Sequence, residues 1–286
     1  MSDSHIKKIL VVGAGQMGAG IAQVSAQAGF GVLLVDALQA SLDKARAGIE
    51  KSLAKLKEKG LLAEEPTEVM ARFKWASSLS EAKTFAPQMV IEAVSENLSV
   101  KQKIFEELDA LLAPEVVFCS NTSSISITKL ASFTKRADRF MGMHFMNPVP
   151  LMKLVELIEG LSTSREVSRI VRGAAERMGK TCVVSKDRAG FIINRILMPM
   201  INESFFVLGE DLGTAEDIDL GMKLGTNQPM GPLALADFIG LDTCLSILEV
   251  MHKYLGEDKY RPAPLLRQYV DAGRLGKKTG IGVYAY

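Results

Sequence analysis

The chain has 286 residues, 48 % of them hydrophobic and 23 % charged, and its formal net charge is +1. These values are typical of a folded globular protein of more than one domain, and they exclude a bulk charge that would recruit nucleic acid or an acidic membrane. No uncharged stretch reaches the roughly 20 residues needed to cross a bilayer. Three widely spaced cysteines show no metal-ligand pattern, so we expect a cytoplasmic protein with reduced thiols and no metal site.

The first half of the chain alternates between predicted strands and helices. Continuous apolar runs, typical of parallel strands buried on both faces, lie at 9–12, 32–35, 89–91 and 116–118. Helices are predicted over 18–28, 41–59 and near 100–112. Strand-like pieces are mixed with prolines over 139–157. This alternation predicts an α/β domain built on a parallel sheet.

Beyond about residue 187 the alternation stops and helices dominate. Predicted helices cover 191–208, with Pro199 inside, and 233–255, and a shorter one follows Pro264. Thr214 and Asp217 resemble a helix-capping pair. The glycine-rich end, 275–286, is predicted as a loop with a short extended piece. We therefore predict an α/β Rossmann-type dinucleotide-binding domain over 1–186 and an all-α domain over 187–286.

A glycine motif follows the first predicted strand and opens the first helix. The match to G-x-G-x-x-G consists of Gly13, Gly15, Gln16, Met17 and Gly18, with Ala14 between the first two glycines. A helix that begins at such a loop offers unpaired N–H groups to a pyrophosphate. Asp36 ends the next strand, where a carboxylate binds ribose hydroxyls and repels a 2′-phosphate. The motif thus predicts NAD rather than NADP, although a glycine-rich turn without a ligand is the alternative.

Several motifs in order along the chain resemble the 3-hydroxyacyl-CoA dehydrogenase family. They are SNTSS at 120–124, MHFMNP at 143–148, VE at 155–156, GFIINR at 190–195, PMGP at 229–232 and GKKTG at 276–280. The short chain is similar in particular to the stand-alone bacterial 3-hydroxybutyryl-CoA dehydrogenases. The resemblance implies NAD-dependent interconversion of (S)-3-hydroxyacyl-CoA and 3-oxoacyl-CoA, and we expect the short-chain pair 3-hydroxybutyryl-CoA and acetoacetyl-CoA. It also implies a homodimer joined through the helical domain.

Hydride transfer from a secondary alcohol needs a base for the hydroxyl proton, and histidine suits neutral pH. Of the three histidines, His5 lies in a polar terminus and His252 in a predicted helix without a catalytic neighbourhood. His144 sits in a matching motif, although a lone histidine is more often structural. The resemblance makes Glu156 its partner, because a carboxylate bonded to imidazole selects the ring tautomer.

The resemblance also assigns binding roles. Ser123 and Asn194 carry over as hydrogen-bonding groups around the substrate oxygens, the alternative being that they cap a turn and a helix. The residues implied to contact the cofactor are Glu96, Lys101, Asn121, Ser123, Asn147 and Lys277.

In this family a helical hairpin, here near 41–70, receives coenzyme A. Ser52 and Lys59 match positions that contact its phosphorylated adenosine. Lysine and arginine outnumber acidic residues over the predicted helix 41–59, which suits phosphates, although such a charged run is usually only a solvated face.

The chain departs from the family pattern at Met146, Ala189 and Gln228, and none of these positions is a proposed catalytic group. One competing interpretation is a sugar-acid dehydrogenase of the same superfamily. Another is a non-catalytic NAD-binding protein. A hydroxyisobutyrate-type dehydrogenase is disfavoured because its lysine motif does not occur.

Overall fold

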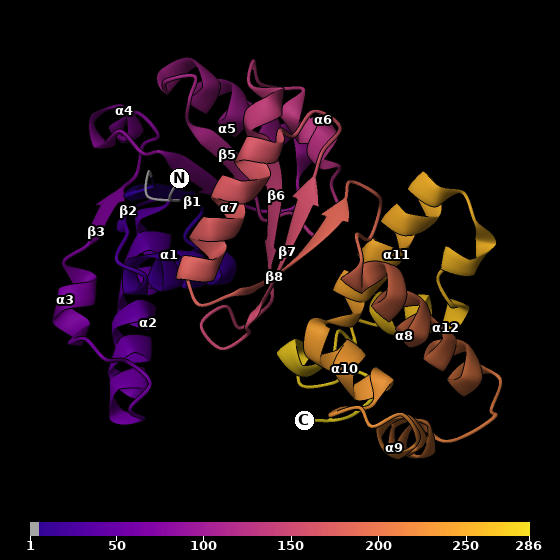
Figure 1. Ribbon diagram of the computed structural model, residues 1–286. Helices are drawn as coiled ribbons and strands as arrows, with labels where there is room; N and C mark the ends of the chain where they lie inside the picture. Colours follow the sequence, from indigo (N-terminus) through magenta and orange to yellow (C-terminus); the bar gives the residue numbers. More distant parts are fainter. Residues whose placement is uncertain (1–5) are drawn as a thin grey trace. The chain divides into compact units, whose positions relative to one another are not determined.

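The computed structural model describes residues 6–286, so His5 lies outside the described residues. The chain divides into two compact units, Met1–Asp187 and Arg188–Tyr286, each with its own hydrophobic core (Figure 1). Over residues 6–286, no helix is long and apolar enough to cross a membrane. The three cysteines are free, and Cys119 and Cys244 are buried.

The first unit is built on an eight-stranded sheet whose order is β3-β2-β1-β4-β5-β6-β7-β8. The strands are β1 (Lys8–Val12), β2 (Gly31–Val35), β3 (Phe73–Ala76), β4 (Met89–Glu92), β5 (Val117–Ser120), β6 (Phe140–Phe145), β7 (Leu154–Glu159) and β8 (Thr181–Lys186). Neighbouring strands pair in parallel except β6 and β7, which are antiparallel. The predicted Rossmann-type sheet is therefore confirmed.

Sequence analysis missed the two edge strands, β3 and β8. Edge strands are only partly covered, and most side chains of β3 and β8 are intermediate or exposed. They therefore lack the continuous apolar run that identified the central strands.

Helices cover the sheet on both faces (Figure 1). They are α1 (Gln16–Gln27), α2 (Gln39–Glu58), α3 (Pro66–Met70), α4 (Glu81–Phe85), α5 (Leu98–Leu111), α6 (Ile127–Ala131) and α7 (Arg165–Arg177). Helix α2 buries the five residues that predicted it, Leu42, Ala45, Ile49, Leu53 and Leu56. The helical spacing of apolar residues predicted α2 correctly because one face of this helix packs on the core of the first unit. Helix α1 contributes residues to the same core and contacts α2.

The second unit is helical, as predicted. Its helices are α8 (Ile193–Gly209), α9 (Ala215–Gly225), α10 (Pro232–Ile239), α11 (Leu241–Leu255) and α12 (Pro264–Asp271). The Thr214 side chain caps α9 by accepting a hydrogen bond from the Asp217 N–H, which confirms the capping pair. The single helix predicted over 233–255 is wrong: Gly240, at φ +103°, separates α10 from α11 because this conformation cannot continue a helix.

A buried carboxylate anchors the end of the chain within the second unit. Asp237 of α10 is 1 % exposed and accepts hydrogen bonds from the N–H groups of Val283 and Tyr284, both at 2.9 Å, and from Tyr286 Oη at 3.1 Å. Burial, with the Asp237 carboxylate, raises the pKa of Tyr286 to about 12. The segment held in this way begins at the turn that carries Lys277.

We expect Asp237→Asn to lower the free energy of unfolding by about 2–3 kcal/mol, because an amide cannot accept all three hydrogen bonds and its NH₂ group meets other donors. Urea unfolding monitored by circular dichroism measures this. Tyr286→Phe, which removes only the Oη contact, is the matched control and should cost about 1 kcal/mol or less. Equal stabilities of Asp237→Asn and the wild type would contradict the anchoring role.

Candidate active site

The glycine loop between β1 and α1 has the geometry of a pyrophosphate cradle. Gly13 lies at φ +101°, and a Cβ there would stand 2.7 Å from the Ala93 carbonyl oxygen. A Cβ on Gly18 would meet the Gly13 carbonyl oxygen at 1.8 Å. A Cβ on Gly15 would meet no atom within 4 Å, so the space above this residue is open to a ligand. The loop therefore fits the phosphates of a dinucleotide at the start of α1.

Asp36 follows β2 and faces the same loop. Its Oδ2 accepts a hydrogen bond from the Ala14 N–H at 2.8 Å, and its Oδ1 accepts one from the Leu38 N–H at 2.9 Å. The carboxylate is thus held beside the pyrophosphate loop, where a ribose would place its hydroxyl groups and a 2′-phosphate would meet a negative charge.

A cavity of 530 Å³ opens between this loop, helix α2 and the turn at 147–150. Gln16 and Asn147 both line it, and Gln16 Nε2 donates to Asn147 Oδ1 at 3.1 Å. Two predicted cofactor residues from distant parts of the chain are therefore in contact. Met17, by contrast, packs against the hydrophobic core of the unit. Lys44 of α2 brings a cationic side chain to the cavity wall.

His144 and Glu156 are cross-strand neighbours on the antiparallel pair β6 and β7. His144 Nδ1 lies 3.2 Å from Glu156 Oε2. The Glu156 side chain is fully buried, and the His144 side chain is 10 % exposed. A buried carboxylate bonded to Nδ1 selects the tautomer and orientation of the imidazole.

Asn121 follows β5, the strand next to β6 in the sheet. Its Oδ1 accepts a hydrogen bond from the Phe145 N–H at 2.8 Å. The orientation of this amide is therefore set by the backbone, and its Nδ2 group is the end that can donate to a ligand.

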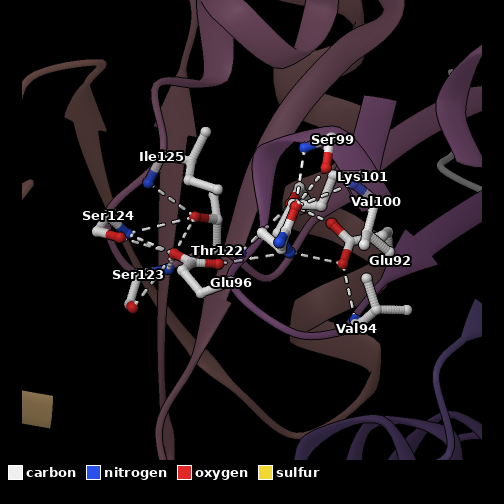
Figure 2. Close-up of polar contacts among 12 residues, drawn as sticks. Glu92, Val94, Glu96, Ser99, Val100, Lys101, Thr122, Ser123, Ser124 and Ile125 are labelled. Carbon is white, nitrogen blue, oxygen red and sulfur yellow. Dashed lines mark hydrogen bonds and ion pairs between the residues drawn. The ribbon is translucent and has the colours of Figure 1, made fainter. Parts of the chain in front are cut away.

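The loop that carries Ser123 is held by Glu96 (Figure 2). Glu96 Oε1 accepts hydrogen bonds from the N–H groups of Ser123 and Ser124, both at 3.0 Å, and from the Thr122 hydroxyl. Partial burial alone would raise the pKa of Glu96, but the Lys101 ammonium and the hydroxyls of Thr122 and Ser124 lower it below its ordinary value. Glu96 is thus an anionic clamp on this loop.

Lys101 is a buried counterion. Its side chain is 1 % exposed, and its Nζ lies 2.6 Å from Glu92 Oε1 and 3.4 Å from Glu96 Oε2. Any influence of Lys101 on the cofactor is therefore exerted through Glu96. Sequence analysis missed Glu92, although a carboxylate that ends the apolar strand 89–91 is a signal that could have identified it.

The remaining predicted site residues lie elsewhere. Ser52 and Lys59 lie on α2 and at its carboxyl end, and Lys59 is exposed. Asn194 is buried in the first turn of α8 in the second unit, and Lys277 opens the last short helix of that unit. His252 is partly exposed on α11, with Nε2 3.8 Å from Asp258. Over residues 6–286, no cluster of His, Cys, Asp and Glu side chains could hold a metal ion.

Comparisons with known proteins identify this arrangement. The model of the 3-hydroxyacyl-CoA dehydrogenase NAD binding domain matches residues 8–188, and that of the C-terminal domain of the same family matches residues 190–286. The chain belongs to the 3-hydroxyacyl-CoA dehydrogenase family. The resemblance inferred from the motifs is therefore confirmed, and with it an NAD-dependent oxidoreductase.

Relatives of this dehydrogenase match over nearly their whole length. A probable 3-hydroxybutyryl-CoA dehydrogenase of Deinococcus radiodurans is 54 % identical over 98 % of this chain and 100 % of its own. A 3-hydroxybutyryl-CoA dehydrogenase of Bradyrhizobium diazoefficiens is 51 % identical over 98 % of this chain and 96 % of its own. The crystal structure of (S)-3-hydroxybutyryl-CoA dehydrogenase from Ralstonia eutropha is 50 % identical, with a TM-score of 0.94 over 98 % of this chain and 99 % of that one.

We expect Asp36→Asn to weaken NADH binding to this dehydrogenase by roughly tenfold, because a charged acceptor for the ribose hydroxyls is lost. NADPH binding should improve or stay unchanged, since the repulsion of a 2′-phosphate is removed. Titration of nucleotide fluorescence gives both dissociation constants. The control is Asp43→Asn, because Asp43 is an exposed carboxylate of α2 that accepts a hydrogen bond from Gln39. An unchanged NADH-to-NADPH ratio in Asp36→Asn would contradict the assignment.

Proposed function

We propose that the protein interconverts (S)-3-hydroxybutyryl-CoA and acetoacetyl-CoA with NAD, and that His144 is the general acid/base. The observation that carries this proposal is the buried His144–Glu156 pair. Strands β5 and β6 are parallel neighbours, so the residues that follow β5 and the end of β6 belong to the same edge of the sheet. That edge is also the one that carries the dinucleotide loop after β1.

In this proposal, side chains of the protein accept and return the proton of the substrate hydroxyl group. When bound, NAD takes up or supplies the hydride at the 3-carbon of the substrate. His144 Nε2 takes the proton of the 3-hydroxyl group as the alcohol becomes a ketone, and returns it in the reverse direction. Glu156 stabilises the imidazolium that forms. Ser123 binds the 3-oxygen, and Asn194 of the second unit orients the acyl oxygens, so that negative charge on oxygen is met by donors.

Coenzyme A is the proposed carrier of the acyl group, and α2 is its proposed docking helix. Ser52 and Lys59 contact the phosphorylated adenosine in this proposal. The solvent-facing side of α2 supports it, since Lys51, Lys55 and Lys59 are exposed there and suit phosphates. Glu96, Asn121, Asn147 and Lys277 complete the proposed set of cofactor contacts.

Exposed apolar side chains on the second unit support a proposed homodimer that is joined through this unit. Helix α9 has no buried residue, although it carries Leu220 and Leu224, which are 54 % and 72 % exposed. Ile196 on α8 is 70 % exposed. Burying these exposed leucines against a partner would add to the stability of α9, and a second copy of this chain is the partner proposed.

The decisive experiment measures oxidation of NADH with acetoacetyl-CoA. We expect turnover with NADH well above that with NADPH, and a kcat lowered about 100- to 10 000-fold in His144→Ala. Glu156→Gln should lower kcat by at least about tenfold and leave the KM for NADH nearly unchanged, because it acts on the imidazole.

His252→Ala is the matched control and should retain full activity. NADH binding without turnover of acetoacetyl-CoA would contradict the proposed substrate and direct attention to sugar acids. Undiminished turnover in Glu156→Gln would contradict the role of the pair.

The dimer is tested by light scattering coupled to size-exclusion chromatography. We expect the wild type to elute with the mass of two chains and the double variant Leu220→Glu and Leu224→Glu with the mass of one, because two charges enter the apolar contact. Leu161→Glu in the first unit, where the leucine is 87 % exposed, should leave the mass unchanged. A wild-type monomer would contradict the proposal.

A further inference from the structure

Glu92 is a fully buried carboxylate at the carboxyl end of β4. Its Oε1 accepts hydrogen bonds from Lys101 Nζ at 2.6 Å and from the Val94 N–H at 2.7 Å, and its Oε2 accepts one from Ser120 Oγ at 2.6 Å. Because its side chain has no exposed surface, it cannot touch substrate or cofactor. A buried charge is costly even when paired, so its value to the protein must come from what it holds in place.

Two routes lead from Glu92 to the segment Thr122–Ser124, here called the Ser123 loop. In the first, Ser120 Oγ donates to Glu92 and accepts a hydrogen bond from the Thr122 N–H at 3.3 Å. In the second, Lys101 lies between Glu92 and Glu96, and Glu96 accepts the N–H groups of Ser123 and Ser124 (Figure 2). Both routes end on backbone N–H groups of the same loop.

The charges explain why Glu92 matters to the second route. One ammonium serves two carboxylates, and it lies closer to Glu92 than to Glu96. Coulombic attraction at these separations is strong in a buried environment. If the charge of Glu92 were removed, Lys101 would be drawn to Glu96 alone, and Glu96 would be pulled from the amides that it clamps.

We propose that Glu92 is a positioning residue for Ser123, acting through Lys101 and Glu96 on one side and through Ser120 on the other. The inference rests on the proposed function, because it is there that Ser123 binds the 3-oxygen of the substrate. A displacement of the Ser123 loop by about 1 Å is enough to misalign a hydrogen-bond donor and lower the rate by up to about 100-fold.

The first test compares Glu92→Gln with Asp109→Asn. Both remove a buried or nearly buried charge that has a cationic partner, and Asp109 pairs with Arg136 near the opposite end of α5. We expect Glu92→Gln to lower kcat/KM for acetoacetyl-CoA about tenfold to 100-fold. Asp109→Asn should lower the melting temperature but leave the kinetics unchanged.

The second test is a double-mutant cycle with Ser123→Ala. If Glu92 acts by placing Ser123, Glu92→Gln should lower kcat/KM by less than about twofold in the Ser123→Ala background. A general loss of stability would lower the rates of both backgrounds equally. Additive effects in this cycle would overturn the proposal.

The third test needs no substrate. Amide hydrogen exchange over 121–125 should be faster in Glu92→Gln than in the wild type or Asp109→Asn, since the Ser123 and Ser124 amides lose their acceptor. Exchange and kcat/KM both unchanged would overturn the role of Glu92. Glu92→Asp undergoes the same tests if Glu92→Gln does not fold, because aspartate keeps the charge but is too short to hold both Lys101 and Ser120. Wild-type enzyme without turnover would contradict the proposed function, whereas the exchange result would still decide the role of Glu92.

Discussion

Because β2, β1, β4, β5 and β6 run parallel, their carboxyl ends meet at one edge of the sheet, and the polar groups discussed for the first unit gather there. The glycine loop follows β1, Asp36 follows β2, Glu92 ends β4, and Asn121 follows β5. Residues separated by more than 100 positions become neighbours without any long-range signal in the sequence, as Gln16 and Asn147 demonstrate. The reversal of direction at β7 then places Glu156 directly opposite His144.

The same edge concentrates charge that the interior would otherwise disfavour. Glu92, Lys101 and Glu156 are all buried, and each has a charged or hydrogen-bonding partner. Replacing buried ion pairs by apolar side chains is often neutral or stabilising for a fold, so stability alone does not account for these pairs. Glu96, the second partner of Lys101, bonds to the backbone of the Ser123 loop, and Glu156 bonds to the imidazole of His144.

The second unit is stabilised mainly by packing between helices rather than by a sheet. Its core is formed by apolar faces of α8, α10, α11 and α12, and the chain end is fastened to α10 by Asp237. Helix α9 contributes no buried residue and relies on its Thr214 cap and on contacts along one side. The exposed leucines of α9 are the surface on which the proposed homodimer depends.

Local patterns in the sequence were sufficient to predict many of the secondary-structure elements of this protein. The glycine loop, the central strands, the buried stripe of α2 and the cap at Thr214 depend on residues close together in the chain, and each was predicted from its own segment. Family motifs supplied His144 and its partner Glu156. Edge strands β3 and β8 were not predicted because half-covered strands have no continuous apolar run. The predicted helix that Gly240 divides was wrong because the amino-acid sequence does not reveal the positive φ of this glycine.

Only the tertiary structure decided what surrounds each polar group. From sequence, Lys101 was a candidate cofactor ligand, and in the structure its side chain is buried between Glu92, at the end of β4, and Glu96. Sequence analysis gave Glu92 no role, and the structure surrounds its carboxylate with three donors, from Val94, Lys101 and Ser120. The sequence determines the strands, turns and helix faces, because these depend on interactions between residues close together in the chain. The partners of buried charges depend on contacts between segments far apart in the chain, and those exist only once the sheet has formed.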